Sequence, residues 1–194
     1  MKRLPLVRAL ELLRDVRTDE VVVTTMGAAR EWPRLSQHPL DFQYLPSAMG
    51  HATMIALGIA LARPERRVLC LTGDGGLLMG LGGLVTIAAA RATNLTVVVL
   101  DNGLYEVTGG QATAGSAAAC DFVMSALAAG FASARRYDDL ALWQADLPAL
   151  VAKDGPPGPR LIQLVVESAG DAYALPAPTS IVERAARFSA ALNG

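Results

Sequence analysis

Cysteine is scarce in this sequence, which contains only Cys70 and Cys120 among 194 residues. Two cysteines cannot build a framework of several disulfides, and they are too few for a cysteine-based zinc site. One lies within an apolar run and the other just before a predicted helix. We therefore expect two free thiols that pack as small apolar side chains.

Clusters of positive charge are also absent. The chain has 17 Lys and Arg residues against 18 Asp and Glu residues, and its formal net charge is −1. No basic stretch is dense enough to indicate nucleic acid or an anionic membrane as a partner. The first residues lack the apolar core of a signal peptide, and no apolar run is long enough to cross a bilayer. These features lead us to expect a cytoplasmic protein.

Aromatic residues make up only 5% of the chain, although 52% of its residues are hydrophobic. The apolar content is instead rich in alanine, and the sequence also contains 18 glycines. This composition is typical of helices packed closely on a parallel sheet. The length favours a single domain over residues 1–194, and the high apolar content suggests that a partner subunit covers part of the surface.

The most informative stretch is a strand, helix and strand unit in the middle of the chain. Residues 68–71 and 95–100 are apolar runs of the kind found in buried strands, and residues 76–92 between them are small residues that suit a helix. The first run is followed by Gly73-Asp74-Gly75, and the second by Asp101-Asn102-Gly103. Both polar turns therefore follow the carboxyl end of a predicted strand.

In parallel sheets, ligands bind beyond the carboxyl ends of the strands, so Asp74 and Asn102 are expected to converge. Carboxylate and amide oxygens suit a hard cation such as Mg²⁺, which completes its coordination with phosphate oxygens and water. The glycines beside Asp74 would let a phosphate approach the first N–H groups of the next helix. The sequence thus predicts a metal-bridged diphosphate site. A capping aspartate and an Asn-Gly turn that bind nothing would explain the same residues.

The remaining elements predict an α/β fold of three layers, with a doubly wound, mostly parallel sheet and helices on both faces. The other expected strands cover residues 21–25, 42–44, 132–137 and 161–166. The other expected helices cover residues 4–16, 30–36, 121–130, 139–153 and 180–192, together with a long helix that starts at Ser47. Residues 103–119 are rich in glycine and small residues, and we expect a loop that covers the ligand.

The chain resembles the diphosphate-binding domain of thiamine-diphosphate enzymes over nearly its whole length. The motifs that carry the resemblance are Gly73-Asp74-Gly75, the Asp101-Asn102 pair a little under thirty residues later, and the Met49-Gly50-His51-Ala52 segment. Two further motifs are Thr25-Met26-Gly27 and Gly109-Gly110-Gln111. Within the superfamily the chain is most similar to phosphonopyruvate decarboxylases and to the beta subunit of sulfopyruvate decarboxylases, although residues 104–107 depart from both.

The resemblance implies Mg²⁺ ligation by Asp74, Asn102 and the carbonyl of Leu104. It also implies that Met49 props the cofactor into its bent shape and that His51 and Glu106 lie near the substrate as candidate catalytic residues. The other residues expected to bind the cofactor are Gly27, Gly50, Gly73, Gly75, Gly76 and Tyr105. From the residues alone, Met49 could be core filler, His51 could be structural, Gly27 could serve only a turn, and Tyr105 and Glu106 could be solvated.

The resemblance further implies one half of a split decarboxylase that acts on a small 2-oxo acid. The pyrimidine end of thiamine diphosphate would be held by a separate subunit, in an assembly such as α2β2 or larger. Two alternatives stay open: a subunit of a carboligase of the acetolactate synthase kind, and a non-catalytic module that binds a diphosphate or nucleotide. A dinucleotide-binding domain is disfavoured because no Gly-x-Gly-x-x-Gly opens a helix.

Overall fold

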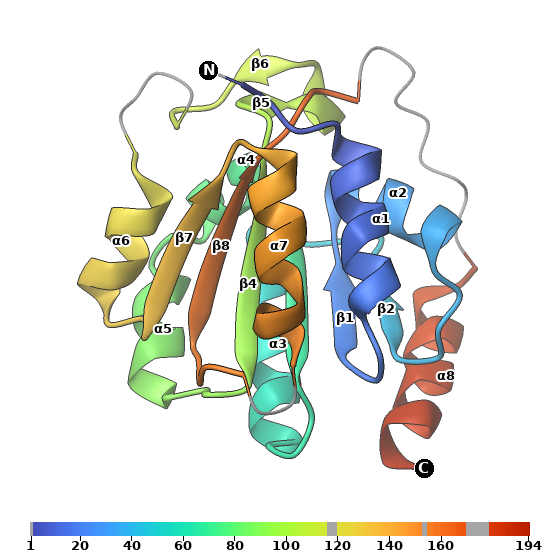
Figure 1. Cartoon of the computed structure of the whole chain (residues 1–194). Helices are drawn as coiled ribbons and strands as arrows, with labels where there is room; N and C mark the ends of the chain where they lie inside the picture. Colours follow the sequence, from blue (N-terminus) through green and yellow to red (C-terminus); the bar gives the residue numbers. More distant parts are fainter. Residues whose placement is uncertain (1, 116–119, 153–154, 170–178) are drawn as a thin grey trace.

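The computed structural model describes residues 2–115, 120–152, 155–169 and 179–194, and these form a six-stranded sheet between two layers of helices (Figure 1). All neighbouring strands of this sheet are parallel, in the order β2-β1-β3-β4-β8-β7. The strands are β1 Val21–Thr24, β2 Asp41–Gln43, β3 Val68–Gly73, β4 Leu95–Asp101, β7 Ser133–Tyr137 and β8 Arg160–Val165. The predicted parallel α/β sheet is confirmed.

Both faces of the sheet are buried under helices, which explains why β1, β3 and β4 are mainly apolar without alternation and why every residue of β8 is buried. One face packs against α1 Leu6–Val16, α2 Met26–Leu35 and α7 Leu140–Val151. The other packs against α3 Ala52–Ala62, α4 Asp74–Met79, α5 Gly83–Ala90, α6 Phe122–Ala129 and α8 Ile181–Asn193. The chain therefore has two apolar cores, one on each side of the sheet.

The direction of winding reverses between β1 and β3. From β1 the chain passes outward to β2 at the edge of the sheet and then returns to β3 on the other side of β1. In open α/β sheets, such a reversal leaves a crevice beyond the carboxyl ends of the two strands. Helix α2 starts directly after β1 and α4 directly after β3, so two helix N-termini face this crevice.

Two predicted helices differ from the observed ones. The single helix expected over residues 76–92 is wrong, because the chain forms α4, a break at Gly80, Leu81 and Gly82, and then α5. A Cβ atom on Gly80 would lie 2.4 Å from the carbonyl oxygen of Gly50, so the break brings two backbone segments together. The helix expected from Ser47 begins only at Ala52, which leaves Met49 and Gly50 in the preceding loop.

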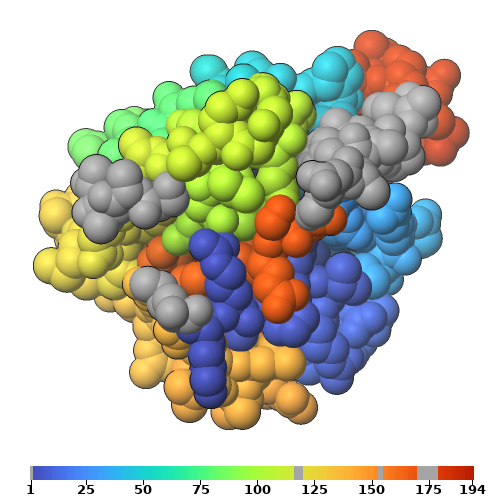
Figure 2. Space-filling view, turned by 90° about the horizontal axis from the view of Figure 1, so that it is seen from above, coloured from blue at the N-terminus to red at the C-terminus, as the bar shows by residue number. Residues whose placement is uncertain are grey.

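The observed bounds of other elements differ from the predicted bounds by a few residues. Helix α2 begins at Met26 rather than Arg30, so the motif interpreted as a turn is the start of a helix. The loop expected over residues 103–119 contains a small antiparallel hairpin, with β5 Leu104–Tyr105, a 3₁₀ turn at Glu106–Thr108 and β6 Gln111–Ala112. Viewed along the strands from their carboxyl ends, this yellow-green hairpin lies over the end of the sheet (Figure 2).

Within the described ranges, no helix has both the length and the apolar character needed to cross a bilayer. The two cysteines are free, and Cys70 is buried in β3 while Cys120 is half-buried. His38 is half-buried, and its Nδ1 lies 3.2 Å from a nitrogen of Arg17. The imidazole also accepts a hydrogen bond from the Leu40 amide, so it serves the loop before β2.

Candidate functional site

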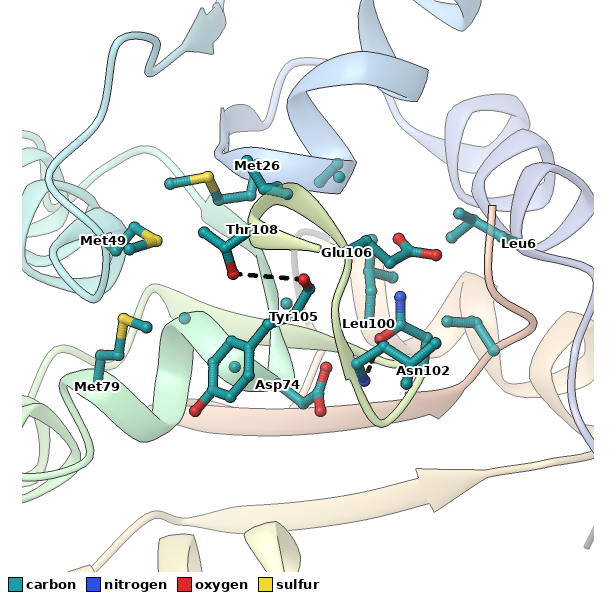
Figure 3. Close-up of a pocket in the computed structure, with 18 residues that line it drawn as sticks. Leu6, Met26, Met49, Asp74, Met79, Leu100, Asn102, Tyr105, Glu106 and Thr108 are labelled. Carbon is teal, nitrogen blue, oxygen red and sulfur yellow. Dashed lines mark hydrogen bonds between the residues drawn. The ribbon is translucent and has the colours of Figure 1, made fainter. Parts of the chain in front are cut away.

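A pocket opens at the carboxyl ends of β1, β3 and β4 and is covered in part by the β5–β6 hairpin (Figure 3). Its floor is formed by the N-terminal residues of α4, and one wall by the first residues of α2. Most of the lining side chains are apolar. The polar side chains come chiefly from the predicted motifs and from the hairpin: Asp74, Asn102, Tyr105, Glu106 and Thr108.

Asp74 is the buried charge of this pocket. It is the first residue of α4 and only 1% of its surface is exposed. Burial raises the pKa of its carboxyl to about 6, and the nearby Asp101 also raises it, while a hydrogen bond from Thr113 opposes the shift. A carboxylate that is desolvated in this way has a strong electrostatic demand for a cation.

Asn102 lies on the next strand end. In the register of β3 with β4, Gly73 pairs with Leu100, so Asp74 and the Asp101-Asn102 turn follow neighbouring strands at nearly the same level. The Oδ1 atom of Asn102 accepts a hydrogen bond of 2.9 Å from the Leu104 amide, which folds the chain around the turn. A carboxamide oxygen has two lone pairs, so Oδ1 retains a lone pair for a cation.

The first residue of the pair, Asp101, is used differently. Its Oδ2 atom accepts a hydrogen bond of 2.7 Å from Nε2 of Gln163 on β8, which holds the side chain toward the neighbouring strand. The carbonyl of Asn102 is in turn held by Arg3, whose guanidinium lies 2.7 Å away. These contacts leave the Asn102 side chain, and not that of Asp101, lining the pocket.

Glycine at position 75 permits a close approach. A Cβ atom built there would lie 2.5 Å from two carbon atoms of the Tyr105 ring, far inside van der Waals contact. The Tyr105 ring therefore lies against the start of α4, where the first backbone N–H groups of a helix have no carbonyl partner within the helix and are suited to an anion. Gly27 is at the matching place near the start of α2, and a Cβ there would lie 3.9 Å from Oε2 of Glu106.

Glu106 connects the hairpin to the segment after β8. Its Oε1 atom accepts a hydrogen bond from the Ser168 hydroxyl at 2.5 Å and another from the Ala169 amide at 2.7 Å. The Glu106 carboxylate thus lines the pocket and also links the 3₁₀ turn to Ser168 and Ala169, so it has a structural role.

Three methionines gather on the side of the pocket opposite Glu106 and Asn102 (Figure 3). Met26 comes from the start of α2 with a backbone φ of 49°, which is unusual for a residue other than glycine. Met49 lies in the loop before α3, and Met79 ends α4. Met49 and Met79 are among the exposed large apolar side chains of the chain. They form a flexible apolar wall at the mouth of the pocket.

Ten of the twelve residues predicted for the site line this one pocket, although their roles there stay predictions. They are Gly27, Met49, Gly73, Asp74, Gly75, Gly76, Asn102, Leu104, Tyr105 and Glu106. Gly50 and His51 are not among the lining residues. Gly50 has a φ of 85° and packs its backbone against Gly80, and His51 is exposed with its Nδ1 3.1 Å from the carbonyl of Met49.

Thr113 is a residue of the site that the sequence did not predict, and its hydroxyl donates a hydrogen bond of 2.7 Å to Oδ2 of Asp74. The two residues are 39 positions apart, and nothing in a local pattern marks a threonine for such a contact. Thr108 and the methionines Met26 and Met79 were also missed, although Met26 stands inside one of the quoted motifs.

Residues 21–158 match the family model described as thiamine pyrophosphate enzyme, C-terminal TPP binding domain. The chain belongs to this family. The matched residues run from β1 to just before β8 and include the ends of β1, β3 and β4 that form the pocket.

Two relatives of the thiamine pyrophosphate domain illustrate its range. The chain is 42% identical over 151 residues to the sulfopyruvate decarboxylase subunit beta of Methanothermobacter thermautotrophicus, and the aligned part covers 77% of each. It is 40% identical over 152 residues to phosphonopyruvate decarboxylase of Streptomyces viridochromogenes, which covers 77% of this chain but only 37% of that enzyme. Both groups are those that the sequence motifs indicated.

A solved structure confirms the fold of the thiamine pyrophosphate domain. The thiamine diphosphate-dependent 4-hydroxybenzoylformate decarboxylase of Rhodococcus jostii superposes with a TM-score of 0.70, over 88% of this chain and 34% of that one. The sequence identity is 18%, so this likeness concerns the fold alone.

The residues present fit a magnesium diphosphate. Among the described residues, no group of three or more His, Cys, Asp or Glu side chains gathers to hold a metal ion. A site with one carboxylate, one carboxamide oxygen and one carbonyl suits a cation whose remaining ligands are phosphate oxygens and water, as is usual for Mg²⁺. The buried carboxylate of Asp74 suits the cation, and the start of α4 suits the diphosphate.

Proposed function

We propose that residues 1–194 form a single diphosphate-binding domain, and that this domain is one subunit of a split thiamine diphosphate-dependent decarboxylase of 2-oxo acids. A separate subunit would bind the pyrimidine end of the cofactor. The observation that carries the proposal is the meeting of buried Asp74 with Asn102 in a pocket faced by the N-termini of α2 and α4. The relatedness to a sulfopyruvate decarboxylase beta subunit over 77% of both chains supports the division into subunits.

In this proposal Asp74, Asn102 and the carbonyl of Leu104 hold Mg²⁺. The carboxylate of Asp74 contributes the negative charge, and its burial keeps competing water away. The free N–H groups at the start of α4 bind the diphosphate from the other side. Gly75 lets the phosphate oxygens come within hydrogen-bond distance of the backbone, provided that the Tyr105 ring moves aside.

When bound, thiamine diphosphate supplies the carbon that attacks the 2-oxo group and the electron sink that lets carbon dioxide leave. The contribution of this chain is to anchor, orient and enclose. Met49 lies at the pocket mouth, where a bulky apolar side chain can support a bent cofactor. The hairpin residues Tyr105, Glu106 and Thr108 cover the site and limit the access of water.

The test is a calorimetric titration of Mg²⁺ and thiamine diphosphate into the full chain, alone and together with its pyrimidine-binding partner. The expected result is tight binding that needs the partner, together with release of carbon dioxide from a 2-oxo acid. Asp74→Asn should abolish binding, whereas Asp101→Asn should retain it, because Gln163 and not the pocket holds that side chain.

Two outcomes would argue against the proposal. If neither the chain nor the mixture binds the cofactor, the domain has lost its family's ligand. If binding is intact but no 2-oxo acid loses carbon dioxide, the domain serves another reaction or a non-catalytic role.

A further inference from the structure

One hairpin lies next to both of the side chains that we propose as ligands of the metal. The β5–β6 hairpin begins at Leu104, two residues after Asn102, and ends directly before Thr113. At its base, the Thr113 amide donates a hydrogen bond of 2.9 Å to the carbonyl of Gly103. The hairpin therefore leaves the sheet at one ligand and returns beside the other.

The contact between the end of the hairpin and Asp74 is made by the side chain of Thr113. Its hydroxyl donates to Oδ2 of Asp74 at 2.7 Å, and each of the two residues has only 1% of its surface exposed. The methyl group of Thr113 lies 3.4 Å from the position of a Cβ atom on Gly75, so the side chain packs against the start of α4. With the rotamer fixed by this packing, the hydroxyl has a defined direction.

A carboxylate at the end of a strand can rotate about its own bonds, and a donor to one oxygen restricts that rotation. Each carboxylate oxygen has two lone pairs, so Oδ2 can accept from Thr113 while the carboxylate still presents lone pairs to a cation, in an orientation that this hydrogen bond restricts. We infer that Thr113 is a positioning residue of the metal site: its hydroxyl fixes the orientation of the Asp74 carboxylate from the end of the hairpin whose other end follows Asn102. The inference rests on the proposed function and names a residue that no sequence motif marked.

A comparison of Mg²⁺ with Ca²⁺ binding tests whether Thr113 orients the Asp74 carboxylate. Mg²⁺ demands near-ideal octahedral geometry, whereas Ca²⁺ accepts variable ligand directions and numbers. Loss of the Thr113 hydroxyl should therefore weaken Mg²⁺ binding far more than Ca²⁺ binding. A general loosening of the hairpin would weaken the binding of both ions alike.

The experiment measures Mg²⁺ and Ca²⁺ affinity by calorimetry at saturating thiamine diphosphate, with the full chain and its partner subunit. Thr113→Val removes the hydroxyl and keeps the shape, and it should lower the Mg²⁺ affinity about tenfold or more, as loss of an outer-sphere hydrogen bond typically does. The Ca²⁺ affinity should change much less. Thr113→Ser keeps the hydroxyl and should restore the preference for Mg²⁺.

Thr53→Val is the matched control, because Thr53 is also a buried threonine, but its hydroxyl has no hydrogen-bond partner among the described residues. It should leave both affinities unchanged. Thr113→Ala, in which a water molecule can take the place of the hydroxyl, serves as a second test if the valine variant is too unstable to purify. It should also bind Mg²⁺ more weakly, by a smaller factor.

The inference is overturned if Thr113→Val and Thr113→Ala bind Mg²⁺ as the wild type does, or if the affinities for the two cations fall by the same factor. A wild-type chain that binds neither cation, with or without its partner, would instead remove the proposed function and this inference together.

Discussion

The aromatic ring of Tyr105 lies against the α-carbon of Gly75, so closely that an added methyl group would stand 2.5 Å from two ring carbons. This contact couples the hairpin to the first turn of α4. The ring thus lies beside the helix start that we propose for the diphosphate.

Gly75→Ala is predicted to destabilise the chain by about 1–3 kcal/mol, because the new methyl group forces the ring out of its place. Removal of the ring should cancel most of this cost. The double variant Gly75→Ala/Tyr105→Ala should therefore lose less free energy of unfolding than the sum of the losses in the two single variants. Urea unfolding of the four proteins measures it.

The control for this prediction is Gly58→Ala. A Cβ atom on Gly58, in the middle of α3, has no neighbour within 4 Å. This substitution should stabilise the chain by about 0.4–1 kcal/mol, since alanine has less conformational freedom to lose on folding. Equal effects at positions 58 and 75 would contradict the steric role assigned to Gly75.

Asp74 is predicted to weaken the metal-free fold. Its pKa is raised from 3.8 to about 6, chiefly by burial. The folded state thus holds its proton more tightly than the unfolded state, and the fold loses stability as the pH rises from about 4 to about 6. This difference in pKa corresponds to about 3 kcal/mol of folding stability, which is absent throughout the range above pH 6.

Asp74→Asn should therefore raise the free energy of unfolding of the metal-free chain at pH 8, by up to about 3 kcal/mol, and leave it unchanged near pH 3. Urea titrations between pH 3 and 8, in the presence of a chelator, test this. With Mg²⁺ and thiamine diphosphate present, the order of stability should reverse, because only the wild type is stabilised by ligand. A variant that is less stable at pH 8 without metal would disprove the assignment.

Glu106 offers a way to separate a structural role from a catalytic one. Ser168 and Ala169 both donate to a single oxygen of its carboxylate. Glu106→Gln keeps such an oxygen, whereas Glu106→Ala leaves the Ala169 amide without this acceptor and should cost about 1–3 kcal/mol. If positioning is the whole role, the glutamine variant should keep most of the wild-type turnover.

A catalytic role would give a different pattern, in which both Glu106 variants lose turnover by a factor of about 100 or more. The measurement is kcat and KM for carbon dioxide release, together with hydrogen exchange of the Ala169 amide. Fast exchange in the alanine variant alone would support the anchoring role of the carboxylate.

The two thiols should react at very different rates. Burial raises the pKa of the Cys70 thiol to about 12, and the side chain is fully enclosed in β3. Cys120 is half-buried. In the native chain a thiol reagent should label one equivalent quickly and the second only on unfolding. Cys120→Ser should remove the fast reaction and Cys70→Ser should leave it, with labelling followed by mass spectrometry.

The strands of the main sheet and the polar turns after β3 and β4 could be predicted because they depend on local sequence patterns. Buried strands of a parallel sheet need apolar residues on both faces, so β3 and β4 stand out in the sequence, and the polar turns after them were identified by contrast. The register that brings Asp74 level with the Asp101-Asn102 turn follows from their place at neighbouring strand ends.

The errors concern contacts between distant segments. The break between α4 and α5 depends on the approach of the Gly50 backbone to Gly80, which a pattern of small residues cannot reveal. The contact between Thr113 and Asp74 requires the hairpin, and strands of two residues carry almost no periodic signal. The resemblance implied that His51 lies near the substrate; its side chain is not among the residues that line the pocket, and its role stays a prediction.

The position of β8 in the sheet has a consequence for how the chain is made. This strand is the last of the six in sequence, yet it lies between β4 and β7. During synthesis, β4 has an open edge and β7 has no neighbour until Arg160–Val165 has left the ribosome. For that interval an apolar strand edge is exposed to other chains, so the nascent domain is expected to need protection by chaperones until its last strand is inserted.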